Sequence, residues 1–306
     1  MTLQLQQDGA TTLFRSRITD SASFIIKLPM AIFSFLLGLV VGSFINVVIR
    51  RGEKGEKLTG RSHCESCGKM LSFLELIPVL SYLVLRGRCR NCNAPFSLQY
   101  PLVELGTGIL YATVAWYLLG SSGNPVSYLE TGFPSAVLVL FLAFVALGAA
   151  IVIFVSDIRS HIIPNGAVLT LLVLGFFRLV YVMSQTKSST IVLDLVWDTG
   201  AALAIALFLA ALWHFSGGRW MGFGDVKLIF ATSLILGFPA AFVAFLLAFW
   251  LGGLLGIILI VSRQKTLQGH IPFGPFILAG AVLTYFLPPD NVLIRSLNDI
   301  IFLWRN

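Results

Sequence analysis

Charged residues are scarce in this chain of 306 residues: they make up 11% of it, whereas soluble domains carry about 25%. Apolar residues make up 57% of the chain, and the mean hydropathy is +0.89. A water-soluble core does not need so many unbroken apolar runs, so the composition indicates a polytopic membrane protein. The net charge of +7 does not predict a nucleic-acid partner, because the basic residues form no continuous patch with interleaved aromatics.

The usual catalytic groups are scarce as well. The chain has four scattered histidines and contains neither G-x-S-x-G nor H-E-x-x-H. All four cysteines lie in one polar segment, which leaves none elsewhere to act as a nucleophile. These absences argue against serine, cysteine and zinc hydrolases and direct attention to carboxylates.

Long apolar runs are abundant, and eight of them are predicted to cross a membrane as helices. The predicted fold class is therefore an all-α polytopic membrane protein. A break at Gly237-Phe238-Pro239 is interpreted as a turn between two spans, because the surrounding stretch is too long for one crossing. The predicted spans are 29–49, 101–119, 134–155, 166–183, 195–215, 226–238, 240–262 and 274–288.

Basic residues are distributed unevenly between the two sides of these spans. The side that includes segment 50–100 holds 14 of the 21 Lys+Arg residues, the opposite side holds 6, and Arg178 lies within a span. The positive-inside rule then predicts that segment 50–100 lies in the cytoplasm and that both termini lie on the opposite side of the membrane. We expect four parts in chain order, with a small cytoplasmic insert between the first and second spans: a polar tail (1–28), a first transmembrane helix (29–49), a cytoplasmic tetracysteine domain (50–100) and a transmembrane domain (101–306).

The cytoplasmic insert contains the pattern C-x2-C-x21-C-x2-C. Two C-x2-C knuckles can direct four thiolates at one centre, and a tetrahedral S4 site suits structural zinc. Disulfides are disfavoured in a reducing cytoplasm, whereas an iron–sulfur centre stays open because four thiolates also suit iron. His63 could replace one ligand. The predicted Zn²⁺ ligands are Cys64, Cys67, Cys89 and Cys92.

Two acids lie at the edges of apolar runs. Asp157 ends one run, and Asp225 begins another after Gly222-Phe223-Gly224. Each has an ordinary explanation, since Asp157 could pair with Arg159 and Asp225 could cap a helix N-terminus. An acid at membrane depth is nevertheless a functional hypothesis by default. Two of them at cytoplasmic span ends favour a catalytic pair.

Such a pair suits peptide-bond hydrolysis. Two carboxylates a few ångströms apart cannot both ionise easily, so they share one proton. The ionised member can take a proton from water, while the protonated member polarises the scissile carbonyl. Neither acid is assigned a fixed role, because the titration belongs to the pair.

Several further motifs occur in a fixed order, and together they resemble the bacterial type IV prepilin peptidases, membrane aspartic proteases that carry a G-x-G-D motif. The resemblance extends from about Phe35 to Leu278. The motifs that carry it are Gly42-Ser43-Phe44-Ile45-Asn46-Val47, the two C-x2-C knuckles, Glu75-Leu76-Ile77-Pro78, Tyr100-Pro101-Leu102-Val103-Glu104, Asp157 with Ile163-Pro164-Asn165, Gly222 to Lys227, and Ile271-Pro272-Phe273-Gly274-Pro275-Phe276.

The resemblance implies removal of basic leaders from type IV prepilins or type II secretion pseudopilins at the cytoplasmic face of the bacterial inner membrane, with Asp157 and Asp225 as the catalytic pair. Both termini are then expected in the periplasm. It also implies N-methylation of the new N-terminus with S-adenosyl-L-methionine as methyl donor. A basic leader would favour acidic contacts, although Glu75 and Glu104 could instead pair with local arginines. The expected loop-support residues are Gly222, Gly224, Lys227, Pro164 and Asn165, and the tentative substrate contacts are Glu65, Glu75 and Glu104.

The two acids would also suit two other classes of protein. A presenilin-like or signal-peptide-peptidase-like intramembrane protease has a tyrosine before its first aspartate and a Pro-Ala-Leu motif. Here Ser156 precedes Asp157, and no Pro-Ala-Leu occurs. A proton-coupled transporter using the same acids should show inverted repeats, and it would leave the cysteine insert unexplained.

Overall fold

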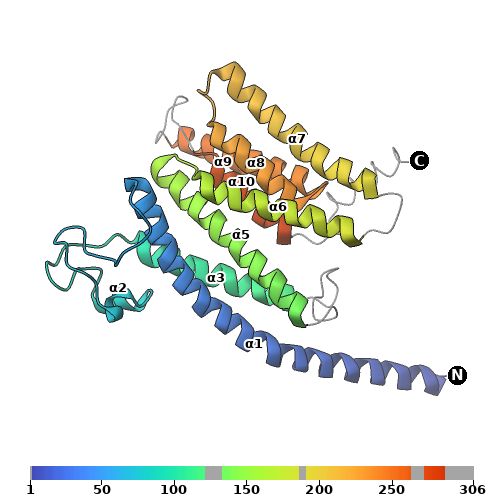
Figure 1. Cartoon of the computed structure of the whole chain (residues 1–306). Helices are drawn as coiled ribbons and strands as arrows, with labels where there is room; N and C mark the ends of the chain where they lie inside the picture. Colours follow the sequence, from blue (N-terminus) through green and yellow to red (C-terminus); the bar gives the residue numbers. More distant parts are fainter. Residues whose placement is uncertain (1, 121–132, 186–190, 263–271, 287–306) are drawn as a thin grey trace. The chain divides into compact units, whose positions relative to one another are not determined.

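The structure is a computed structural model that describes residues 2–120, 133–185, 191–262 and 272–286. Within these ranges the regular elements are all helical, which confirms the predicted all-α class (Figure 1). In chain order they are α1 (Thr2–Lys54), η1 (Phe73–Leu76), α2 (Leu80–Val84), α3 (Gln99–Gly120), α5 (Phe133–Ser160), α6 (Asn165–Gln185), α7 (Ile191–Ser216), α8 (Phe223–Leu236), α9 (Ala240–Val261) and α10 (Gly274–Phe286).

Each of the eight predicted spans overlaps a helix, and residues 287 and 288 of the last span lie outside the described residues. Two of these helices are shorter than a bilayer requires: α8 has 14 residues and the described part of α10 has 13. The chain is thus a multi-pass membrane protein. Lys187, Arg263, Lys265, Arg295 and Arg305, which entered the orientation count, lie outside the described residues. The segments long and apolar enough to cross are Lys27–Lys54, Gln99–Leu119, Val137–Ser160, Asn165–Ser184, Leu195–Ser216 and Ala240–Val261.

The predicted break between the sixth and seventh spans is confirmed. Helix α8 ends at Leu236, and α9 begins at Ala240. Gly237 between them has φ = 71°, a left-handed conformation that glycine adopts without steric cost. A Cβ at this position would also overlap the guanidinium of Arg178.

The chain divides into two compact units, residues 1–148 and 149–306. In the first unit α1 packs along α3 (Figure 1). Gly38 and Gly42 form a G-x-x-x-G pair on α1, and small residues of this kind allow helices to approach closely in a membrane. A Cβ at Gly38 would lie 2.7 Å from the Cα of Gly108, and one at Gly42 would lie 2.7 Å from the Cα of Glu104.

In the second unit α8 packs against α6, α7, α9 and α10. Its sequence is apolar nearly all round, as expected of a helix enclosed by others. Leu228, Ile229 and Ala231 are accordingly almost fully buried. The central helix of this unit therefore carries Asp225 in its first turn.

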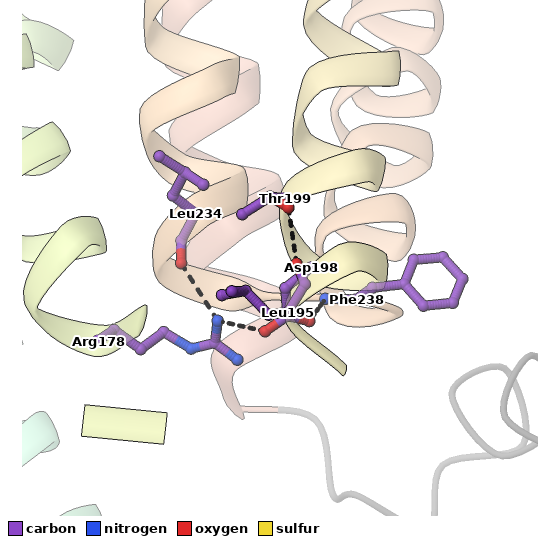
Figure 2. A network of polar contacts seen from close by, with 6 residues as sticks. All are labelled: Arg178, Leu195, Asp198, Thr199, Leu234 and Phe238. Carbon is purple, nitrogen blue, oxygen red and sulfur yellow. Dashed lines mark hydrogen bonds and ion pairs between the residues drawn. The ribbon is translucent and has the colours of Figure 1, made fainter. Parts of the chain in front are cut away.

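A network of polar contacts binds the far end of α8 (Figure 2). The Arg178 Nη1 on α6 donates to Asp198 Oδ2 on α7 at 2.7 Å and to the carbonyl of Leu234 at 3.4 Å. The other oxygen of Asp198 accepts the N–H of Phe238 at 2.8 Å. The charge of Arg178, which lies within a predicted span, is therefore neutralised by Asp198 on the neighbouring helix α7. Charged residues inside membranes usually pair with one another in this way.

Candidate functional site

Asp157 lies in the last turn of α5 and is 4% exposed. Its Oδ2 accepts a hydrogen bond from the N–H of Gly274, the first residue of α10, at 3.1 Å. Gly274 leaves little room there, because a Cβ on it would lie 2.6 Å from the same oxygen. One oxygen of Asp157 is therefore held against the beginning of α10.

Asp225 is the third residue of α8 and is 6% exposed. Its Oδ2 accepts the N–H of Gly222, the residue before the helix, at 3.1 Å. Gly222 and not Asp225 therefore occupies the N-cap, and Asp225 makes the reciprocal contact of a capping box from the third position of the helix. This contact uses only one carboxylate oxygen, and in the described part of the chain Oδ1 has no recorded hydrogen bond. The capping contact consequently leaves one oxygen available for chemistry.

The two carboxylates are brought together in the second unit. They interact electrostatically, and the glycines beside them meet a common side chain, Ile163. A Cβ at Gly224 would lie 3.1 Å from the Ile163 Cβ, and one at Gly274 would lie 3.4 Å from the Ile163 Cδ1. Segments far apart in the sequence thus bring Gly224, which precedes Asp225, and Gly274, which binds Asp157, to one isoleucine.

The expected loop-support residues are also neighbours. The Nζ of Lys227 donates to the Oδ1 of Asn165 at 2.6 Å, which links the second turn of α8 to the beginning of α6. The carbonyl of Pro164 accepts the N–H groups of Ala167 and Val168 at 3.1 and 3.2 Å and so starts α6. These contacts fix the segment from Asp157 to α6 against the segment that carries Asp225.

Two members of this site were absent from the predicted site residues. Gly274 and Ile163 both fall inside motifs noted in the sequence, yet neither has a side chain that suggests chemistry. Their contributions are a backbone N–H and an apolar contact. The signal that could have identified Gly274 is its place in Pro272-Phe273-Gly274-Pro275, where a glycine beside two prolines indicates close backbone approach.

The four cysteines form a single cluster in the first unit. Their sulfur atoms all lie within 4.8 Å of one another, and the Sγ atoms of Cys64 and Cys92 are 3.8 Å apart. A tetrahedral site with Zn–S bonds of about 2.3 Å places its sulfurs about 3.8 Å apart. The four thiols therefore fit a metal ion and do not form disulfides.

The two knuckles have the same backbone pattern. The N–H of Cys64 donates to the carbonyl of Lys69 at 2.9 Å, and the N–H of Cys89 donates to the carbonyl of Ala94 at 2.9 Å. The residue after each second cysteine has a left-handed backbone, with φ = 70° at Gly68 and 55° at Asn93. Glycine and asparagine are the residues that adopt this conformation most readily. The sequence thus folds twice into the same metal-binding turn.

Backbone N–H groups in the knuckles favour thiolates at Cys67 and Cys89. Hydrogen bonding from Lys69 lowers the pKa of Cys67, and bonds from Cys92 and Asn91 lower the pKa of Cys89 to about 7. A lowered pKa suits a metal ligand, because the thiolate is the form that binds. At Cys92 the backbone hydrogen bond from Ala94 also lowers the pKa, but burial and the three neighbouring cysteines raise it to about 11. His63 is not part of the sulfur cluster.

The three acids predicted as substrate contacts have different surroundings. Glu65 pairs with Arg50 and Lys54, and the hydrogen bond from Arg50 lowers its pKa. Glu75 accepts the N–H and hydroxyl of Ser72 at 2.7 and 2.8 Å, and the N–H bond lowers its pKa. The buried Glu104 accepts the N–H of Val79 at 2.7 Å. The alternative that Glu75 and Glu104 pair with arginines is not what the described residues show.

Two segments of the chain match models of known protein families. Residues 36–118 match the model of the bacterial peptidase A24 N-terminal domain, and residues 144–257 match that of the type IV leader peptidase family. No solved structure matches the chain.

Three similar proteins carry the name prepilin leader peptidase/N-methyltransferase. The one from Burkholderia pseudomallei (strain K96243) is 32% identical over 83% of this chain and 84% of its own length. The corresponding values are 33%, 82% and 89% for Aeromonas hydrophila, and 31%, 85% and 94% for Bacillus subtilis (strain 168). The chain therefore belongs to the type IV leader peptidase family.

Proposed function

We propose that this protein is a prepilin leader peptidase of the bacterial inner membrane that also N-methylates the new N-terminus. The observation that carries the peptidase activity is the meeting of two buried carboxylates, Asp157 and Asp225, in a chain of this family. The substrates would be type IV prepilins or type II secretion pseudopilins. Such a substrate offers a basic leader followed by an apolar helix, and acids at the membrane edge would meet the junction between them.

The proposed mechanism uses the two acids as a pair. The ionised carboxylate takes a proton from a water molecule as that water attacks the scissile carbonyl. The protonated carboxyl donates a hydrogen bond to the carbonyl oxygen and stabilises the negative charge that develops there. The N–H groups of Gly274 and Gly222 each hold one oxygen of one acid. The opposite oxygens would then face the water and the substrate.

The second activity is methyl transfer with S-adenosyl-L-methionine as donor. It is supported by the word N-methyltransferase in the names of the relatives and by the presence of the whole cysteine insert. Because cleavage creates the amino group that is methylated, the two reactions would proceed in that order on one substrate.

We further propose that the insert metal is structural zinc. Four thiolates complete a tetrahedral site and leave no open position for catalysis. The insert and the acid pair would lie on the cytoplasmic side, with both termini in the periplasm, as the distribution of basic residues predicts.

Glu65 and Glu75 are the proposed contacts for the basic leader. Glu75 is exposed, and its carboxylate is oriented by Ser72. Charge reversal in Glu75→Lys should raise the apparent KM for a basic leader while leaving kcat nearly unchanged, because binding and not chemistry is affected. Cleavage kinetics equal to those of the wild type would exclude this contact.

The direct test uses purified protein in detergent with a synthetic prepilin and S-adenosyl-L-methionine. Mass spectrometry would follow loss of the leader and gain of one methyl group. We expect both changes with the wild type and neither with a variant in which Asp157 and Asp225 are both asparagine, since uncleaved substrate has no new N-terminus. Leader loss with the double variant would refute the proposal.

The two alternative functions are not favoured. The family match covers both the insert and the membrane domain, whereas neither a presenilin-like protease nor a transporter accounts for the insert.

A further inference from the structure

A cavity of about 390 Å³ lies in the first unit, between α1, the cysteine insert and the beginning of α3. Its size falls in the range of about 300–1,000 Å³ that is usual for small-molecule sites. Aromatic and ionic side chains converge on it. Those that matter here are Asn46, Arg50, Tyr82, Phe96, Tyr100 and Glu104.

Glu104 distinguishes this cavity from an ordinary surface hollow. It is 7% exposed, and its carboxylate accepts the N–H of Val79 at 2.7 Å and the hydroxyl of Ser43. Among the described residues no lysine, arginine or histidine forms an ion pair with it. A buried carboxylate is costly unless a cation accompanies it. The cavity thus presents a buried carboxylate that no described lysine, arginine or histidine neutralises.

Arg50 is incompletely satisfied in the same cavity. Its terminal nitrogen pairs with Glu65, and its guanidinium lies 5.9 Å from the centre of the Tyr100 ring. Its Nε is buried without an acceptor among the described residues. A buried donor without a partner costs about 1–3 kcal/mol. A ligand that completes the site would therefore bring a cation to Glu104 and an acceptor, such as a carboxylate, to Arg50.

We propose that this cavity is the methyl-transfer site and that Glu104 binds the α-ammonium group of the cleaved substrate. The inference rests on the methylation proposed above and assigns a place to it. A sulfonium methyl donor with a carboxylate would supply the acceptor for Arg50. Glu104 binds the substrate amine, and the methyl group is transferred to the nitrogen of that amine.

Glu104 has a defined role in the reaction. Its carboxylate takes one proton from the α-ammonium group and leaves a neutral amine. The nitrogen lone pair then attacks the methyl carbon of the sulfonium donor. As the N–C bond forms, the C–S bond breaks and its electron pair remains on sulfur as a neutral thioether. The positive charge moves to the methylated nitrogen, and Glu104 releases its proton to solvent.

The test compares the full-length wild type with Glu104→Gln in detergent. Glu56→Gln is the matched control, since Glu56 lines the same cavity but is exposed. A leaderless pilin peptide and a complete prepilin are supplied separately with S-adenosyl-L-methionine. Methylation of the leaderless peptide by Glu104→Gln should fall at least about 100-fold, as for loss of a general base. Cleavage of the complete prepilin should keep its kcat and KM.

Binding provides a readout that is independent of turnover. Without donor, a leaderless peptide with a free α-amino group should bind the wild type about tenfold more tightly than Glu104→Gln, as expected of a charged hydrogen bond. The same peptide with an acetylated N-terminus should bind both proteins equally. The Glu56→Gln control should match the wild type in both measurements.

Four outcomes would overturn the inference. Unchanged methylation by Glu104→Gln would remove Glu104 from the reaction. A raised KM for prepilin cleavage with normal methylation would show that the cation belongs to the leader. A parallel fall in cleavage and methylation would indicate a structural role. A wild-type enzyme that cleaves but never methylates would refute the proposed methylation itself, and the site with it.

Discussion

Replacing Gly274 by alanine tests whether the beginning of α10 positions Asp157. The added Cβ would lie 2.6 Å from Asp157 Oδ2, whereas ordinary contacts begin at 3.4 Å. The carboxylate must therefore move by about 0.8 Å, the difference between these two distances. A displacement of about 1 Å in a catalytic geometry can cost about 100-fold in rate. We expect kcat for leader removal to fall by about this factor.

The fold should survive this change. Gly274 does not have a left-handed backbone, so alanine can adopt its conformation without strain. Gly166→Ala in α6 is the control, because nothing lies within 4 Å of its added Cβ. Initial rates with a synthetic prepilin would be measured beside thermal unfolding of all three proteins. Cleavage by Gly274→Ala within about threefold of the wild type, at an unchanged Tm, would show that this contact does not set the catalytic geometry.

Two further predictions concern the metal and the intramembrane ion pair. Cys89→Ser should release the metal and increase hydrogen exchange in segment 55–98, where η1 and α2 are the only helices. Exchange in α8 should stay slow, because the metal stabilises only the insert. Retained metal in the purified variant would contradict this prediction. Arg178→Met should lower the free energy of unfolding by about 3 kcal/mol, the low end for a broken buried pair, since the Arg178 side chain is 30% exposed. Adding Asp198→Asn should recover part of that loss, because asparagine removes the unpaired charge and still accepts the N–H of Phe238. Thermal unfolding of the single and double variants measures this recovery, and a double variant less stable than Arg178→Met would contradict it.

Much of the fold could be predicted from local signals. An apolar run of about twenty residues must form a helix to satisfy its backbone in lipid, so the positions of the apolar helices followed from hydropathy. The beginning of α1 at Thr2, within the predicted polar tail, did not. The break before α9 was predictable because Gly237 and Pro239 both interrupt helices. The sulfur cluster was predictable because C-x2-C spacing by itself directs two thiolates at one point.

The contacts that complete each site could not be predicted in this way. The N–H that holds Asp157 comes from Gly274, 117 residues away, and a backbone donor carries no side-chain signal. Arg178 was recognised as a charge inside a span, but its partner Asp198 lies on another helix. The surroundings of Glu104 depend on the close approach that Gly42 allows between α1 and α3. Each of these requires the packing between helices, which hydropathy does not specify.

The central claim is that Asp157 and Asp225 act together on the scissile bond. The most direct measurement is leader removal from a synthetic prepilin by Asp157→Asn and Asp225→Asn, each in the otherwise unchanged chain. Asparagine keeps the shape of the side chain but cannot ionise or share a proton. We predict that both variants fold with the thermal stability needed for the assay and that neither cleaves. Cleavage by either variant near the wild-type rate would contradict the paired mechanism and reduce that acid to a helix cap or an interfacial charge.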